Sequence, residues 1–335
     1  MKFIKNKEVL VIGGLGYVGT SLVPSLIKDG YTVTILDSMI FGNNLELQES
    51  KNLKIIKGDF RDLELINTLT KERPIVIHLA ALSNDSSSEI DEKYTREINY
   101  FGTMKLIDQC IQNQVPHFIF ASSASVYGIQ DGNVTEDTLP NPITLYGELK
   151  LKIEKYLFAQ ESMNFTVVRP ATLCGYSNRL RLDLSVNILT YSGFFDKKIK
   201  VFGGSQYRPN LNIQDMVRFY MLLLKMPLSL INRQIYNVSY CNKSILELAE
   251  LTQSQLNNHS EIEIVPTTDL RSYVLSSEKS TRELGFQCKY TIEDAIDTLI
   301  NCFEKETKKH LSSDLFRNVA RIKNLLNEVK DDKLC

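Results

Sequence analysis

Residues 8–19 read EVLVIGGLGYVG, an apolar run that passes directly into Gly13, Gly16 and Gly19, spaced three residues apart. The run predicts a buried strand, and the pattern over 17–29 predicts a helix. Glycine lets the backbone between them turn sharply and approach a pyrophosphate, while the start of the helix offers free N–H groups and partial positive charge. The stretch therefore predicts a dinucleotide site in an α/β fold. The alternative is a glycine turn that binds nothing.

The same alternation of strand and helix continues along the chain. Helical patterns such as 62–72, 94–114 and 145–162 separate further short β-branched runs, at 31–37, 53–59, 75–81, 117–123, 165–171 and 234–239. The runs are apolar on both faces, as the strands of a covered parallel sheet are. We therefore expect an α/β fold with a doubly wound parallel sheet.

The alternation breaks after residue 170, which predicts a second structural unit. Polar and turn-rich residues fill 171–212, helix and strand return over 213–240, and a second polar and helical block follows. The residues from 304 onward are highly charged and helical in pattern. This pattern favours a solvated end helix over a helix that binds a partner.

Composition excludes several classes of protein. The 335 residues are 43% hydrophobic and 24% charged with a net charge of −1, which is ordinary for a soluble globular protein and argues against nucleic-acid binding. Six cysteines without C-x-x-C spacing and only four histidines argue against a metal site. Scattered cysteines fit reduced thiols in a cytosol, so we expect a cytoplasmic protein. No apolar stretch reaches 18 residues, so no membrane span is expected, and the first apolar run is too short for a signal peptide.

Two acidic residues follow predicted strands in positions that suit a dinucleotide. Asp37 ends the second strand, 18 residues beyond Gly19. A carboxylate there accepts hydrogen bonds from both ribose hydroxyls of NAD and repels the 2′-phosphate of NADP, so NAD is favoured. Asp59 ends the third strand and is a candidate for the adenine end. A simple turn acid is a nearly equal alternative for Asp59.

A tyrosine and a lysine form the candidate catalytic pair. Tyr146 and Lys150 are spaced i, i+4, so they share one face of the helix predicted over 145–162. Chance alone gives about one Tyr–Lys pair at this spacing in a chain of this composition. The catalytic interpretation therefore rests on where the pair lies, one loop after the fifth predicted strand. A phenol is a poor base at neutral pH, but a nearby lysine and a cationic nicotinamide lower its pKa. Ser123, at the end of the fifth strand, could then orient a substrate hydroxyl, although serines in such a place are commonly turn residues.

Several motifs together resemble the extended short-chain dehydrogenase/reductase family. They are GGLGYVG, Asp37, HLAA at 78–81, Asn99 in INYFGT, SSASVYG, YGELK and YNVS at 236–239, in this order between about residues 8 and 303. The family contains nucleotide-sugar epimerases, dehydratases and dehydrogenases. The resemblance implies Ser123, Tyr146 and Lys150 as the catalytic trio.

The resemblance also implies the domains and the assembly. We expect an NAD-binding Rossmann domain from 1–170 plus 213–240, and a smaller C-terminal domain that binds a nucleoside-diphosphate sugar from 171–212 plus 241–335. A homodimer through helices that include 94–114 and 145–162 is implied as well.

Site residues follow from the motif positions. The resemblance implies that NAD is contacted by Gly13, Gly16, Tyr17, Val18, Asp37, Asp59, Phe60, Leu79, Ala80, Ala81, Asn99, Tyr146 and Lys150. It implies that the substrate is contacted by Ser123, Ser125, Thr172, Asn187, Arg208 and Arg271. Arg179 and Arg181 are candidates for substrate or dimer contacts, and a solvated charged face is an equal alternative.

The residues after Ser123 favour one activity within the family. The 4,6-dehydratases carry acids there, whereas this chain has Ala124 and Ser125, neither of which can protonate a leaving hydroxyl. A nucleotide-sugar 4-epimerase is therefore favoured over a dehydratase. A 4-dehydrogenase that stops at the keto sugar stays open, as does a non-catalytic NAD-binding protein. The stretch SNRLRLDLSVN at 177–187 is similar to a subgroup acting on bacterial cell-surface sugars, including GDP-heptose 4-dehydrogenases, which suggests surface-polysaccharide biosynthesis.

Overall fold

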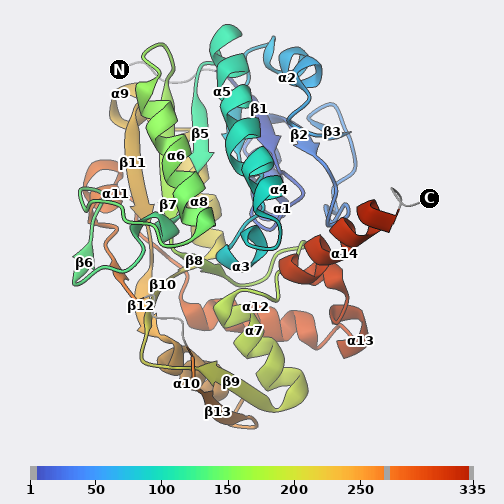
Figure 1. Cartoon of the computed structure of the whole chain (residues 1–335), viewed down its shortest axis with the longest axis vertical. Helices are drawn as coiled ribbons and strands as arrows, with labels where there is room; N and C mark the ends of the chain where they lie inside the picture. The colour runs from blue at the N-terminus through green and yellow to red at the C-terminus, as the bar shows by residue number, and fades with distance from the viewer. Residues whose placement is uncertain (1–5, 268–271, 332–335) are drawn as a thin grey trace.

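A seven-stranded parallel sheet forms the centre of the computed structural model, which describes residues 6–267 and 272–331 (Figure 1). The strands lie in the order β11-β7-β5-β4-β1-β2-β3. Their bounds are β1 Glu8–Ile12, β2 Thr32–Asp37, β3 Leu53–Lys57, β4 Ile75–His78, β5 Phe118–Ala121, β7 Phe165–Pro170 and β11 Gln234–Val238. The order reverses between β1 and β4, and ligands of such sheets bind at the carboxyl ends of the strands beside this point. The predicted doubly wound α/β sheet is confirmed.

Helices cover both faces of the sheet because its strands are apolar on both faces. Val9 and Val11 of β1 pack into one hydrophobic cluster with α1 (Gly19–Lys28), α8 (Ile213–Leu223) and α11 (Glu278–Leu284). Leu10 and Ile12 pack into a second cluster with α2 (Leu63–Thr70), α5 (Thr103–Gln112) and α6 (Leu145–Ala159). The register fixes this alternation, since Val9 pairs with Val33 of β2 and Ile75 of β4.

The helix predicted over 94–114 contains a change of helical geometry. It runs from α4 (Glu92–Arg96) through a π-helical segment, η1 (Glu97–Gly102), into α5. Single π-helical segments often occur at functional sites. Asn99 lies in this segment, directly behind the carboxyl end of β4.

A smaller unit lies beyond the carboxyl edge of the sheet (Figure 1). It contains a three-stranded sheet of β8 (Thr172–Cys174), β10 (Tyr207–Asn212) and β12 (Cys241–Ser244), and the strand pair β9 (Lys198–Phe202) and β13 (Glu261–Val265). Helices α7 (Ser185–Tyr191), α10 (Ile245–Gln255) and α12 (Ile292–Phe303) share a hydrophobic cluster with these strands. The exact domain boundaries stay a prediction.

Short elements complete the described chain. They are α3 (Asp85–Ser88), the 3₁₀ turn η2 (Ala124–Tyr127), β6 (Asn133–Val134), η3 (Ser192–Asp196), α9 (Leu228–Ile231), β14 (Val274–Leu275), α13 (Lys308–Leu311) and η4 (Asp314–Phe316). Across residues 6–267 and 272–331, no helix has the length and apolar character needed to cross a membrane.

The last helix, α14 (Asn318–Asp331), is docked against the sheet domain rather than fully solvated. Ile322 is 1% exposed and belongs to the same hydrophobic cluster as Leu10 and Ile12, with Leu326 packed beside it. Arg321 Nε also donates to the carbonyl of Ile40 at 2.8 Å. The expectation of a solvated end helix is therefore wrong for one face, because Ile322 and Leu326 form a short apolar stripe among the charged residues.

Candidate active site

A cavity of about 450 Å³ lies at the carboxyl edge of the main sheet. It brings together most of the residues that the sequence singled out. Its lining includes Gly13, Gly16, Tyr17, Val18, Asp37, Asp59, Phe60, Leu79, Ala80, Ala81, Ser123, Ser125, Tyr146, Lys150, Thr172, Arg179 and Arg181.

The glycine-rich turn has the geometry that a bound dinucleotide requires. Gly13 has φ +82°, and a Cβ there would lie 2.6 Å from the backbone nitrogen of Ala80. A Cβ on Gly19 would lie 2.4 Å from the carbonyl oxygen of Gly14. No side chain caps the start of α1, although the N–H groups of Thr20 and Ser21 already donate to the carbonyls of Gly16 and Val18, so an anion would meet the backbone of the turn just before them. These residues fit the diphosphate of NAD.

Asp37 lies at the end of β2, where a ribose hydroxyl could reach it. Its carboxylate accepts hydrogen bonds from the amides of Leu15 at 3.0 Å and Met39 at 2.8 Å. Burial raises the pKa of Asp37, whereas the two amides and the charge of Arg179 lower it. The acid is thereby tied to the glycine-rich turn that precedes α1.

Asp59 and Asn99 each have a protein partner of their own. Asp59 lines the cavity and also pairs with Arg61, whose Nη2 lies 2.5 Å from its carboxylate. Asn99 is not among the residues that line the cavity; it accepts from the amide of Leu82 at 2.9 Å and donates to its carbonyl at 3.0 Å. Asn99 therefore positions the loop after β4, and a direct contact with NAD stays a prediction.

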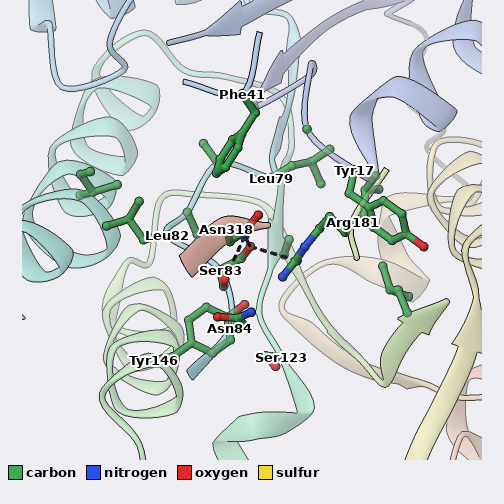
Figure 2. Close-up of a pocket in the computed structure, with 18 of the residues that line it drawn as sticks. Tyr17, Phe41, Leu79, Leu82, Ser83, Asn84, Ser123, Tyr146, Arg181 and Asn318 are labelled. Carbon is green, nitrogen blue, oxygen red and sulfur yellow. Dashed lines mark hydrogen bonds between the residues drawn. The ribbon is translucent and has the colours of Figure 1, made fainter. Parts of the chain in front are cut away.

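The three residues of the predicted catalytic trio all line the cavity. Tyr146 and Lys150 project from α6, and the Lys150 Nζ atom lies 5.6 Å from the centroid of the Tyr146 ring. Lys150 donates to the carbonyl of Ala121 at 2.6 Å, which ties α6 to the end of β5. Ser123 follows that strand and also lines the cavity, where its hydroxyl donates to Ser125 Oγ at 3.1 Å; Ser123 and Tyr146 are both labelled in the lower part of Figure 2.

The two ionisable groups of the trio are strongly shifted by burial. Burial raises the pKa of Tyr146 to about 12, and Asp85 adds to this shift, while Arg181 and the hydrogen bond with Ser123 oppose it. Burial also lowers the pKa of Lys150 to about 7, with the charge of Glu154 opposing. From the sequence we expected Lys150 to lower the pKa of the tyrosine. In the structure, the groups that lower the pKa of Tyr146 are Arg181 and Ser123.

A buried network lies behind the trio. The Glu154 carboxylate accepts hydrogen bonds from Ser122 Oγ and, at 3.0 Å, from Arg169 Nε. Arg169 also donates to the hydroxyl of Tyr127 at 2.8 Å, and that hydroxyl donates to Asn237 at 2.8 Å. These contacts join α6 to strands β7 and β11 and hold the turn that carries Ser123. Ser122 therefore has a structural role.

The predicted substrate residues are only partly brought together. Thr172 and Ser125 line both the main cavity and a smaller adjoining one of about 70 Å³, which Arg208 also lines. Arg271 lies outside the described residues. The substrate contact predicted for Asn187 is corrected by the structure. Asn187 is fully buried, lies outside the cavity lining and is hydrogen-bonded to the backbone of Gly175 and Arg181. Because these contacts occupy its amide, Asn187 holds the chain between the two units.

Both candidate arginines are buried in the cavity wall, so the alternative of a solvated charged face is wrong. Arg181 Nε donates to Asp183 at 3.0 Å, and its Nη1 donates to Ser83 Oγ at 3.1 Å (Figure 2). The Arg179 guanidinium stacks 3.9 Å from the centroid of the Phe41 ring.

The sequence analysis missed several residues that line the cavity. Ser83, Asn84 and Asp85 follow β4, and the polar stretch SNDSSS after an apolar strand was the signal that could have found them. Asn318 and Leu325 reach the cavity from α14, and no local pattern indicates this.

Comparisons with known proteins agree with this geometry. The model of the NAD dependent epimerase/dehydratase family matches residues 9–239. A UDP-glucose 4-epimerase of Lactobacillus helveticus is 28% identical over 323 residues, which cover 87% of this chain and 95% of the relative. A dTDP-D-glucose 4,6-dehydratase of Bos taurus is 28% identical over 326 residues, covering 89% of each chain.

A solved structure, MoeE5 in complex with UDP-glucuronic acid and NAD, superposes with a TM-score of 0.78 at 26% identity. The match covers 89% of this chain and 99% of MoeE5. The resemblance drawn from the sequence motifs is thus confirmed. The chain belongs to the NAD dependent epimerase/dehydratase family, and NAD is its cofactor.

Proposed function

We propose that this protein is a nucleotide-sugar 4-epimerase that acts by transient oxidation at C4 of a nucleoside-diphosphate sugar. The observation that supports this is the convergence of Ser123, Tyr146 and Lys150 on the cavity that also holds the glycine-rich turn. The relatives named above are enzymes of nucleotide sugars by their names, which supports the same class of substrate.

In this proposal each residue of the trio has a defined role. Bound NAD⁺ supplies a hydride acceptor and a positive charge beside the phenol. Tyr146 takes the proton of the C4 hydroxyl, and Ser123, which lines the same cavity, orients that hydroxyl with a hydrogen bond of its own. Lys150, buried beneath the phenol, holds the ribose and favours the phenolate when it is protonated. Epimerisation then requires the keto sugar to turn before C4 is reduced from its other face.

The alternative activities diverge after the C4 oxidation. A 4-dehydrogenase releases the 4-keto sugar and leaves the cofactor reduced. A 4,6-dehydratase needs an acid beside the sugar to eliminate water, and the positions after Ser123 hold Ala124 and Ser125. Asp85 lines the cavity and acts electrostatically on Tyr146, so it is the one acid that we would test for that role.

A panel of UDP-, GDP-, CDP- and dTDP-sugars, followed by NMR, tests the proposal. Inversion at C4 without net NADH supports the epimerase. Stoichiometric NADH with a ketone product supports the dehydrogenase, and a new C6 methyl signal supports the dehydratase. Tyr146→Phe is the matched control, and we expect its rate to fall about 10²- to 10⁴-fold. A variant that retains full activity in cells would favour a non-catalytic NAD-binding protein.

We further propose that the protein works in the cytoplasm as a homodimer, in the synthesis of surface-polysaccharide sugars. Its scattered cysteines support the compartment, and its family resemblance supports the dimer. Phe101 of η1 and Phe158 of α6 are both exposed on the helices that we expect at the interface. Light scattering of the wild type beside Phe101→Asp tests this: we expect a dimer that the variant weakens.

A further inference from the structure

Arg179 carries a buried charge that forms no direct ion pair with a carboxylate, although Asp37 and Asp183 lie near enough to act on it electrostatically. Its side chain is 2% exposed, and none of the ion pairs among the described residues involves it. Its Nε atom is buried without a hydrogen-bond partner. Arg169 and Arg181, by contrast, pair with Glu154 and Asp183. An unpaired buried charge is costly, so a guanidinium in this state indicates an anionic ligand.

The position of Arg179 indicates which anion it would meet. Its backbone N–H bonds the hydroxyl of Thr20 at 3.3 Å, in the first turn of α1. Ser177 nearby donates to the carbonyl of Tyr17 at 2.6 Å. The guanidinium lies over Phe41, in the segment that follows Asp37. Arg179 therefore lies between the glycine-rich turn and the acid that suits the adenosine ribose.

The last helix holds this side chain in place. Asn318 Oδ1 accepts from Arg179 Nη2 at 2.6 Å. The amide of Asn318 in turn donates to Ser83, at 3.0 Å to the hydroxyl and 3.2 Å to the carbonyl (Figure 2). Burial of Ile322 anchors α14 and thereby positions Asn318.

We propose that Arg179, held by Asn318, binds the diphosphate of NAD. The guanidinium would face the phosphates from one side while the glycine-rich turn and the positive end of α1 face them from the other. Burial, together with repulsion from Arg181, lowers the pKa of Arg179 to about 9, so the group is still charged at neutral pH. The doubly charged diphosphate would supply the direct ion pair that neither Asp37 nor Asp183 forms with Arg179.

Two ligands of this family carry a diphosphate, the cofactor and the proposed sugar nucleotide. The contacts of Arg179 with Thr20 and Phe41 favour the cofactor, whereas the sequence made Arg179 a candidate for a substrate or dimer contact. Asn318 lies outside residues 9–239 that the family model matches, so this contact would be a feature of the chain's C-terminal helix.

The test compares ligands with and without the diphosphate on full-length protein freed of bound nucleotide. Calorimetry gives the affinities of ADP and adenosine for the wild type and for Arg179→Gln. We expect the ratio of ADP affinity to adenosine affinity to fall about 10- to 100-fold in the variant, as the loss of a charged hydrogen bond implies. The affinity for adenosine alone and the affinity of NAD-loaded protein for UDP should not change.

Lys323→Gln is the matched control, because it removes the same charge from an exposed position of α14. Its ratio of ADP to adenosine affinity should equal that of the wild type. A loss of UDP affinity in Arg179→Gln with an unchanged ratio would assign the arginine to the substrate and overturn the proposal. An unchanged ratio with unchanged UDP affinity would overturn it as well.

A second variant keeps the proposal testable if Arg179→Gln fails to fold. Asn318→Asp places a carboxylate on the guanidinium with almost no change of shape, and so neutralises it. We expect this variant to fold, because the new ion pair with Arg179 offsets the lost donor to the Ser83 carbonyl, while the ADP affinity falls and less NAD remains bound after purification. Retention of wild-type ADP affinity in this variant would contradict a phosphate-binding role for Arg179.

Discussion

Replacing Lys150 with methionine should change how the stability of the protein depends on pH. The Lys150 side chain is 4% exposed, and burial lowers its pKa from 10.5 to about 7, against the charge of Glu154. Below pH 7 the amine is charged in both the folded and the unfolded chain. Between pH 7 and 10.5 only the unfolded chain binds the extra proton, so the wild type gains stability as the pH rises.

The size of this effect follows from the pKa shift. One proton difference corresponds to about 1.4 kcal/mol for each pH unit. The wild type should therefore gain about 4 kcal/mol relative to Lys150→Met between pH 7 and pH 10. The lost hydrogen bond to Ala121 adds an offset that does not depend on pH.

Urea unfolding of nucleotide-free wild type and variant, at each pH unit from 7 to 10, measures the difference directly. Other titrating groups cancel in that difference. Lys152→Met is the control, because it removes a lysine of the same helix whose side chain is 44% exposed rather than buried. A Lys150→Met difference that stays constant within about 0.5 kcal/mol would refute the lowered pKa of Lys150.

Three further changes test the parts that support the site. Glu154→Gln leaves the Arg169 guanidinium buried without its counter-charge, so we expect the free energy of unfolding measured in urea to fall by about 3 to 5 kcal/mol. Adding Arg169→Met to the same chain should restore much of this stability. Gly13 has φ +82°, and Gly13→Ala puts a Cβ 2.6 Å from the backbone nitrogen of Ala80. We therefore expect the purified variant to contain little bound NAD, measured after acid release. A normal NAD content would contradict the close approach. Asn99→Ala removes both hydrogen bonds to the loop after β4, at a cost of about 1 to 3 kcal/mol for each unpaired group, and an unchanged melting temperature would count against this positioning role.

The sheet could be predicted from the sequence because each strand is a short apolar run with its own local signal. The ends of the runs were less predictable. The run at 75–81 continues three residues beyond the end of β4 at His78, and those residues instead form the cavity wall beside Gly13. Apolar composition marks a buried segment, but it does not show where the backbone leaves the sheet.

The cavity wall was predictable only where a motif lies on one continuous stretch. The sequence could not decide between a substrate or dimer contact and a solvated face for Arg179, because its partner, Asn318, is 139 residues away in sequence. Ser83 and Asn318 are 235 residues apart, and nothing in either segment indicates that they meet. Contacts between residues so far apart in sequence depend on how α14 packs against the sheet domain. That packing involves few apolar side chains, among them Ile322 and Leu326.

The docking of α14 also bears on when the cofactor can be captured during synthesis. Asn318 and Leu325 are translated after all seven strands of the sheet, yet they line the cavity. Domains generally fold as units while the chain is still growing. The nascent sheet domain would thus present an open, unfinished nucleotide groove at the ribosome, and the wall formed by α14 would close over it only after residue 325 has emerged.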